Sequence, residues 1–315
     1  MKRTIKILLI SATCLLIFGI LLMAGSAAII RTTGQGWGAP HEQATTQRAE
    51  LTSIQTLSLT LVSEPIHILR GGDSVVIEWS EMYDNQYTLN KVEGQSLSLS
   101  RTSQDWRWNV FGLRNLFFGV DRASNRPVTV RIPEGMNLRA IDLRGANIVA
   151  TIDDIEALDV NISGANARAT LTDITARDLE ISGANIYAAL TNVYASTVTI
   201  SGANARSTLN NAEAHNISIS GANARATLNH TDASAITLSG ANVIAQLNNI
   251  SANSVEVLGA NANATMTLQS IDDWGFNVSG TRASLRIDGQ RATGFRGSNT
   301  VTVSGANARL DVQTR

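Results

Sequence analysis

Alternation of apolar and polar residues dominates the chain from about residue 51 onward. Within each stretch between regularly spaced glycines, apolar or small residues recur three, five and seven positions after the glycine, and a second alternating run precedes the next glycine. One such stretch has these residues at Ala167, Ala169 and Leu171, then at Leu179 and Ile181. A period of two is typical of β-strands that bury one face. We therefore predict two strands per stretch, joined at a corner by a short apolar run such as Ile174 and Ala176.

These stretches form a repeat whose signature is Gly-Ala-Asn. Its glycines, 19 residues apart, are Gly145, Gly164, Gly183, Gly202, Gly221, Gly240 and Gly259. The register then loosens at Gly280, and the signature returns at Gly305. A fixed period of this size indicates a solenoid, while the L-x-x-L-x-L pattern of leucine-rich repeats is absent. A helix would need spacings of three and four and would place glycine inside the element. We predict an all-β fold, a single-stranded parallel β-helix (β-solenoid) with 19-residue coils.

The glycine and asparagine of the signature are predicted to build a corner of each coil. Glycine after serine would permit a positive φ there. Stacked coils lie about 4.8 Å apart, so equivalent amides can form a hydrogen-bonded ladder. The ladder residues are Asn147, Asn166, Asn185, Asn204, Asn223, Asn242, Asn261 and Asn307. We expect this row to be scaffold and not a binding row.

The regular repeats occupy residues 144–315, and residues 51–143 alternate less regularly. We interpret 51–143 as strands that lead into the solenoid and cap its first coil. At the other end, Trp274, Phe276 and Phe295 are expected to seal the core. The last strand, residues 301–312, is expected to be an edge protected by Arg309 and Asp311.

Residues 105–120 hold much of the aromatic content. The aromatic residues of this segment are Trp106, Trp108, Phe111, Phe117 and Phe118, and Arg107 and Arg114 accompany them. One interpretation is an interaction patch, or a segment on a membrane interface, where tryptophan and arginine are favoured. The other is a cap over the open end of the core.

The N-terminus carries a basic flank and then a long apolar run. Lys2, Arg3 and Lys6 precede residues 7–30, and about 20 apolar residues suffice to cross a bilayer. We predict a transmembrane anchor in residues 1–30, with the rest of the chain outside the cytoplasm. The alternative is a signal peptide cleaved near Ser26, while Cys14 lacks the preceding leucine of a lipoprotein site. Residues 31–50 are predicted to be a flexible linker.

Composition excludes several function classes. The net charge of −1 gives no overall basic footprint for nucleic acid, and 43% apolar residues argue against disorder. Cys14 is the one cysteine, and the four histidines (His41, His67, His215 and His230) are scattered, so no metal site is specified. No nucleotide-binding or hydrolase motif is present, and no cofactor is expected.

Two rows of polar residues remain as candidate chemistry. Acids near one corner, Asp153, Asp154 and Asp173, give way in later coils to Asn192, Asn210, Asn211 and Asn229. This drift indicates corner hydrogen bonding, although a carbohydrate-active enzyme using clustered acids is the alternative. Four residues after the glycine stand Arg168, Arg206, Arg225 and Arg309. They could bind anionic glycans, or they could form a solvated face, interrupted by Tyr187 and Ile244.

The Ser-Gly-Ala-Asn coils, with the lead-in Arg126-Pro-Val-Thr-Val-Arg-Ile-Pro-Glu-Gly-Met-Asn-Leu, resemble bacterial β-strand-repeat families described as putative adhesins. These include families described as an auto-transporter adhesin head domain. The resemblance covers about residues 51–312. It implies a surface-exposed β-helix similar to pectin-lyase folds but without their catalytic residues.

We therefore expect a non-catalytic, membrane-anchored binding module or adhesin of the bacterial cell envelope. Its partners would be the membrane and cell-wall or surface glycans, or envelope proteins. The alternative is an accessory of other membrane proteins, acting through residues 105–120, with a role in stress signalling.

Overall fold

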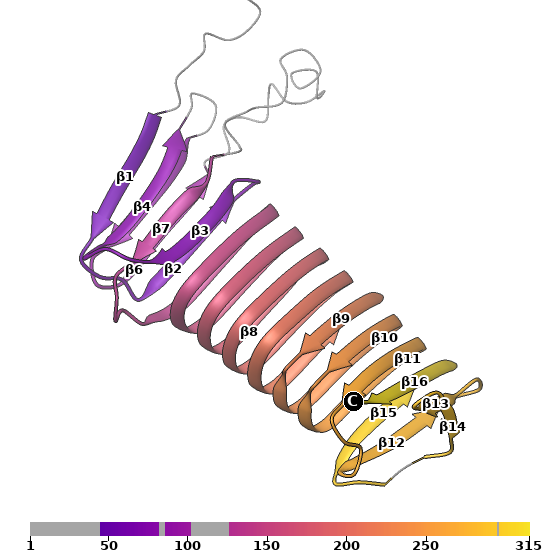
Figure 1. Ribbon diagram of the computed structural model, residues 1–315. Helices are drawn as coiled ribbons and strands as arrows, with labels where there is room; N and C mark the ends of the chain where they lie inside the picture. The colour runs from indigo at the N-terminus through magenta and orange to yellow at the C-terminus, as the bar shows by residue number, and fades with distance from the viewer. Residues whose placement is uncertain (1–44, 82–85, 102–125, 295) are drawn as a thin grey trace, which may run out of the picture. The chain divides into compact units, whose positions relative to one another are not determined.

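A computed structural model describes residues 45–81, 86–101, 126–294 and 296–315, which belong to one compact unit (Figure 1). Every regular element among them is a β-strand, and none of their segments forms a helix long and apolar enough to cross a membrane. The predicted anchor, the linker up to residue 44, the aromatic segment 105–120 and Phe295 lie outside the described residues.

Sixteen strands form one sheet. The strands before the repeats are β1 (Thr45–Leu51), β2 (Thr56–Leu61), β3 (Pro65–Arg70), β4 (Val75–Glu81), β5 (Tyr87–Val92), β6 (Ser96–Arg101) and β7 (Val128–Ile132). The repeats hold β8 (Leu138–Ser220), β9 (Asn223–Asn229), β10 (Asp232–Asn248) and β11 (Ser251–Leu268). The C-terminal strands are β12 (Trp274–Ser279), β13 (Ser284–Ile287), β14 (Gln290–Ala292), β15 (Asn299–Ser304) and β16 (Asn307–Thr314).

In the regular part, each segment pairs in parallel with the segment 19 residues earlier. Asn204 lies opposite Asn223, and Gly240 lies opposite Gly259. Figure 1 shows the 83-residue strand β8 winding through several such repeat units. The inward positions predicted from the alternation are buried, among them Ala167, Ala169, Leu171, Leu179, Ile181, Ile174 and Ala176. Burial of one side chain in two is what stacking of alternating strands produces.

The repeat glycines are required by close approach and not by backbone conformation. None of those from Gly145 to Gly259, nor Gly305, has a positive φ, so the prediction of a left-handed glycine corner is wrong. A Cβ atom added to Gly240 would lie 1.8 Å from the carbonyl oxygen of Gly221 in the unit below. A similar clash recurs from Gly164 to Gly259 and at Gly305, because each of these glycines lies directly on the glycine of the neighbouring unit, and at Gly145 the clash is with Leu61.

Left-handed conformation occurs instead at the other end of the post-glycine strand. Six residues 19 positions apart have φ between 49° and 54°: Asp154, Asp173, Asn192, Asn211, His230 and Asn249. Asp, Asn and His are the non-glycine residues most tolerant of this region. The Asp-to-Asn drift therefore follows a turn that each repeat unit makes, as the hydrogen-bonding interpretation expected.

The lead-in region already follows the stacking register. Strands β2 and β3 pair in parallel with β8, and β6 and β7 pair in parallel with β2 and β3. Antiparallel strands flank this stack, β1 beside β4, β4 beside β7, and β5 beside β6. Strand β1 begins at Thr45, so residues 45–50 of the predicted linker are strand.

At the C-terminal end, the last strands of the sequence are internal. Strand β15 pairs with β11 on one side and β12 on the other, and β16 lies between β11 and β13. The prediction that residues 301–312 form an edge is therefore wrong, although Arg309 and Asp311 do form an ion pair at 2.7 Å. The outer positions belong to β12, which pairs with β15, and to β14, which pairs with β13. Trp274 and Phe276 of β12 are buried as predicted.

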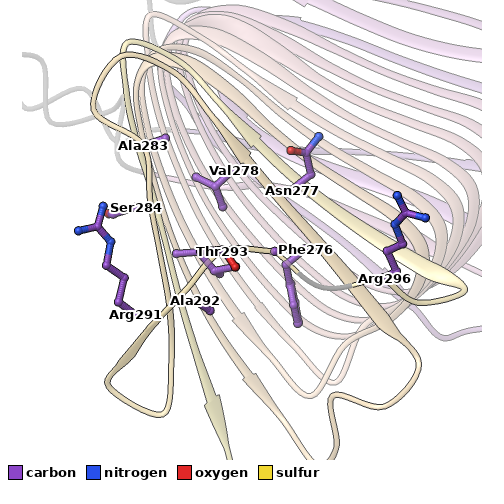
Figure 2. A pocket seen from close by; sticks show the side chains of 11 residues that line it. Phe276, Asn277, Val278, Ala283, Ser284, Arg291, Ala292, Thr293 and Arg296 are labelled. Carbon is purple, nitrogen blue, oxygen red and sulfur yellow. The ribbon is translucent and has the colours of Figure 1, made fainter.

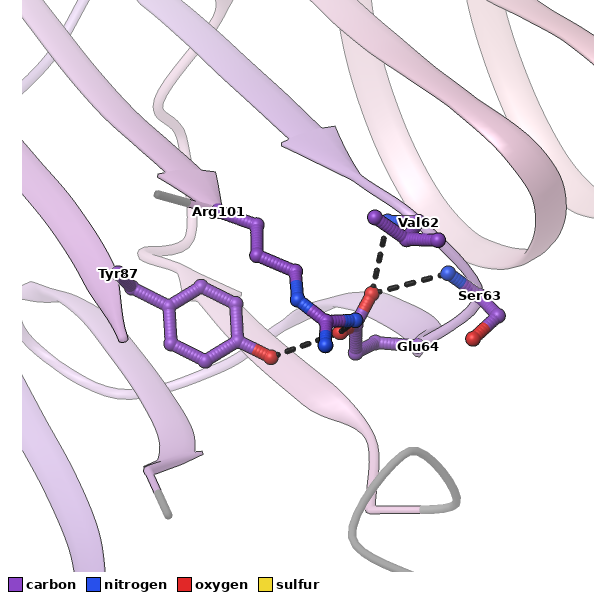
Figure 3. Close-up of polar contacts among 5 residues, drawn as sticks. All are labelled: Val62, Ser63, Glu64, Tyr87 and Arg101. Carbon is purple, nitrogen blue, oxygen red and sulfur yellow. Dashed lines mark hydrogen bonds and ion pairs between the residues drawn. The ribbon is translucent and has the colours of Figure 1, made fainter. Parts of the chain in front are cut away.

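A buried ion pair closes the corner between β2 and β3 (Figure 3). The Glu64 carboxylate accepts hydrogen bonds from the amides of Val62 and Ser63, from the Tyr87 hydroxyl at 2.9 Å and from Arg101 at 3.0 Å. Burial raises the pKa of Glu64, but these donors outweigh it and hold that pKa below its usual value. Burial and the Glu64 charge raise the pKa of Tyr87.

Candidate functional site

The strand that follows each glycine presents an outward face with arginine but no acid over six repeat units. Its outward residues from Arg168 to Thr267 are arginine, tyrosine, threonine, asparagine, glutamine, alanine and isoleucine. Arg168, Arg206, Arg225 and Tyr187 are exposed on it, and we call these four residues the arginine face. Acids stand only beyond its two ends, at Asp153 and Asp311.

The three arginines of this face have no acidic partner within the described part of the chain. Three other arginines of the repeats do have one. Arg144 binds Asp142 at 2.8 Å, Arg177 binds Asp159 and Asp178 at 2.6 and 2.7 Å, and Arg309 binds Asp311. Because a guanidinium group binds carboxylate or phosphate through two parallel hydrogen bonds, a row of such groups without acidic partners is available to an anion.

A shallow groove of about 700 Å³ runs between the arginine face and the asparagine ladder. It is lined by residues of five stacked units, from Asn147 to Arg225. Within it the Arg168 guanidinium carbon lies 5.0 Å from the centre of the Tyr187 ring, at cation–π distance. This contact fixes the ring and one guanidinium with respect to each other and offers a combined flat surface.

The ladder forms the other wall of the groove. Each Asn Nδ2 donates to the Asn Oδ1 of the preceding unit at 2.6–2.9 Å, from Asn147 through to Asn307. The predicted ladder is therefore present. An amide nitrogen has two hydrogens, and one remains on each residue for a ligand or water. Arg282 takes the corresponding place in the outermost unit, where Gly280-Thr281-Arg282 replaces the signature.

The row of corner acids continues as a ladder of hydrogen-bonded side chains. Asp173 accepts from Asn192 at 2.7 Å, and Asn192 accepts from Asn211 at 2.8 Å, so the row is a second amide ladder. Asn210 and Asn229 belong to a third, linked at 2.7 Å. No group of three or more His, Cys, Asp or Glu side chains able to hold a metal occurs among the residues described.

A second pocket, of about 780 Å³, lies beside β12, β13 and β14 (Figure 2). Phe276 and Val278 line it, and Arg291 and Arg296 stand on opposite sides. No sequence pattern predicts this pocket, because the repeat signature is lost in β12, β13 and β14. Residue 295, in the loop that lines it, lies outside the described residues, and we assign no role to the pocket.

The aromatic residues predicted to form an interaction patch, Trp106, Trp108, Phe111, Phe117 and Phe118, lie outside the described residues, whereas the predicted arginines Arg168, Arg206 and Arg225 lie on the arginine face. The described strands on either side of that segment are β6, which ends at Arg101, and β7, which begins at Val128. Their parallel partners in the neighbouring unit are β2 and β3.

No protein-family model and no curated protein matches the chain. Solved structures do resemble it. A putative adhesin from Bacteroides fragilis has 11% identity and a TM-score of 0.38, covering 87% of this chain and 98% of its own. One from Parabacteroides distasonis has 11% identity, a TM-score of 0.35 and coverage of 86% and 98%. A putative cell adhesion protein from Clostridium sporogenes has 8% identity, a TM-score of 0.22 and coverage of 87% and 100%. Similarity at these scores assigns neither a family nor an activity to this chain.

Proposed function

We propose that the chain is a β-solenoid binding module of the bacterial cell envelope, non-catalytic and anchored outside the cytoplasm by residues 1–30. The parallel 19-residue register of the repeats supports the solenoid. The basic flank and apolar run of the N-terminus support the anchor and its orientation. Long, uniform ladders of identical side chains suit an extended binding surface more than a catalytic centre.

The observation that carries the binding role is the row of unpaired arginines beside the groove. Arg168, Arg206 and Arg225 are solvent-exposed and lack an acidic partner in the described chain, while the outward face of this strand has no acid across six units. Such a face attracts extended anions, because ion pairs within the chain do not neutralise its positive charges.

The test compares binding of the full chain, purified in detergent, to envelope fragments of bacteria by co-sedimentation. We expect the wild-type chain to sediment with them and the triple variant R168Q/R206Q/R225Q to remain in solution. The control is R177Q. It removes one exposed charge, from an arginine that is already paired with Asp159 and Asp178. Equal binding by the wild type and the triple variant would refute the assignment of binding to this face.

Catalysis is tested separately, because acids at Asp153 and Asp154 were the one alternative suggested by the sequence. Incubation of the full chain with acidic polysaccharides should release no new reducing ends. Cleavage that D153N or D154N abolishes would show that the chain is an enzyme.

A further inference from the structure

We propose that the arginine face binds a linear polysaccharide that carries carboxylate groups, with the polymer running along the stacking direction of the repeat units. This inference rests on the proposed binding function and names its ligand class.

The direction follows from the arrangement of the charges. Arg206 and Arg225 are direct partners on neighbouring strands, and Arg168 lies two units before Arg206, with Tyr187 between them. Neighbouring strands are about 4.8 Å apart, so the four side chains span about 14 Å along a single line. A ligand that meets all of them must be extended and must carry more than one anionic group.

Carboxylate recognition follows from the guanidinium chemistry. Arginine presents a planar fork that binds a carboxylate through two parallel hydrogen bonds. With no acid on the face between Arg168 and Thr267, these forks are not already occupied by the chain itself. Elsewhere on the regular strands, Arg177 shows the same preference by binding two aspartates.

Polysaccharide recognition follows from the neutral groups on both sides of the arginine row. On one side, the asparagine ladder offers one spare amide hydrogen per unit. On the other side stand the hydroxyls of Thr208 and Thr227, two residues beyond Arg206 and Arg225. Sugar hydroxyls both donate and accept hydrogen bonds, so a chain of sugars can bond to the asparagine amides on one side and to the threonine hydroxyls on the other. The half-exposed Tyr187 ring provides an apolar surface for the face of a sugar ring.

A nucleic acid is a poorer match. Its backbone carries one phosphate per nucleotide in each strand, and tight binding normally uses many cationic contacts. This face has three, in a chain whose net charge is −1. The strands before each glycine add further carboxylates, such as Glu180 and Glu256, that would repel a broad polyanion.

The experiment measures binding of polygalacturonate to the full chain in detergent by titration calorimetry. Fully methyl-esterified polygalacturonate, which has the same backbone without charges, and inorganic polyphosphate serve as comparison ligands. We expect polygalacturonate to bind, the ester to bind at least about tenfold more weakly, and polyphosphate to bind more weakly than polygalacturonate. R206Q/R225Q and Y187A should each weaken polygalacturonate binding, R177Q should leave it unchanged, and circular dichroism should confirm that the variants fold.

Oligogalacturonates of increasing length test the direction of the polymer. Affinity should rise until the oligomer spans about 14 Å and then level off. Equal binding of polyphosphate and polygalacturonate, or of acid and ester, would overturn the inference. If the chain binds envelope fragments through its arginines but not polygalacturonate, the ligand class is wrong and the proposed function stands; if it binds neither, both fail.

Discussion

Ser207 places a hydroxyl on the inward side of the stack, where neighbouring units have Ala188 and Ala226. It is 1% exposed, and its Oγ has no hydrogen-bond partner within the described structure. A buried polar atom without a partner keeps its desolvation cost. The side chain one atom smaller already fits the same position in the adjacent units.

We therefore expect S207A to stabilise the protein by about 1 kcal/mol. The measurement is the free energy of unfolding from urea titration. S220A, at a position that is not buried, is the control and should change this free energy little. A loss of stability in S207A would show that the hydroxyl is satisfied in the native state.

Glu64 makes the stability of the protein depend on pH. Its pKa in the folded protein is held below the usual 4.5 because the hydrogen bonds of the corner favour its charged form. The cluster therefore contributes its full stability above pH 4.5 and loses it as the pH falls through the lowered pKa. E64Q should be less stable than wild type at pH 7 by about 3 kcal/mol, since it leaves Arg101 without its buried anion.

Thermal unfolding between pH 7 and pH 3 checks this prediction. The difference between wild type and E64Q should shrink as the pH falls. A constant difference over the whole range would mean that the Glu64 charge does not stabilise the corner.

At the scale of the strands, the spacing between units depends on the column of glycines. Gly221, Gly240 and Gly259 lie on one another so closely that a single methyl group would meet a carbonyl oxygen of the adjacent backbone. Backbone atoms held by ladder hydrogen bonds on both sides cannot shift to make room. The glycines thus fix where successive post-glycine strands begin, and this keeps the asparagines and arginines in register.

G240A should destabilise the protein by about 3 kcal/mol, at the upper end of the usual cost of overpacking. Chemical denaturation measures the effect. The control is A241S, at the exposed neighbouring position, which should cost little. If G240A were as stable as the control, the close approach of the glycine column would not be a constraint.

The strand pattern was open to prediction from the sequence because it repeats. Alternation and the 19-residue period gave the buried positions and the asparagine ladder. The role of the glycines could not be predicted. A positive φ and a close backbone approach both require glycine, so the sequence does not distinguish the two. The Glu64 corner was missed because it occurs once, between partners as distant as Tyr87 and Arg101.

The order of the last units does leave a signal in the sequence. Asn307 completes the full signature and joins the ladder at Asn261, whereas Gly280 is followed by Thr281 and Arg282. The segment that keeps the ladder residue is the one that lies next to β11. The arginine row was predicted from the sequence, with Arg309 as a member and Tyr187 as an interruption. Its groove, the Arg168–Tyr187 contact and the lack of acidic partners needed the structure.

At the scale of the whole described unit, the stacking register is the basis of every other conclusion. The ladders, the glycine column and the line of arginines all require that residues 19 positions apart in the repeats be direct neighbours. Thr208 and Thr227 are such neighbours on the outward face, and Gln246 lies one unit further.

Cross-linking of paired cysteines tests this register most directly. A disulfide needs Cα atoms about 4.4–6.8 Å apart, which adjacent strands provide and strands two units apart do not. In a C14S background, mild oxidation should join T208C to T227C almost completely and T208C to Q246C hardly at all, as measured by mass spectrometry of non-reduced peptides. Equal cross-linking of both pairs, or of neither, would contradict the 19-residue stack.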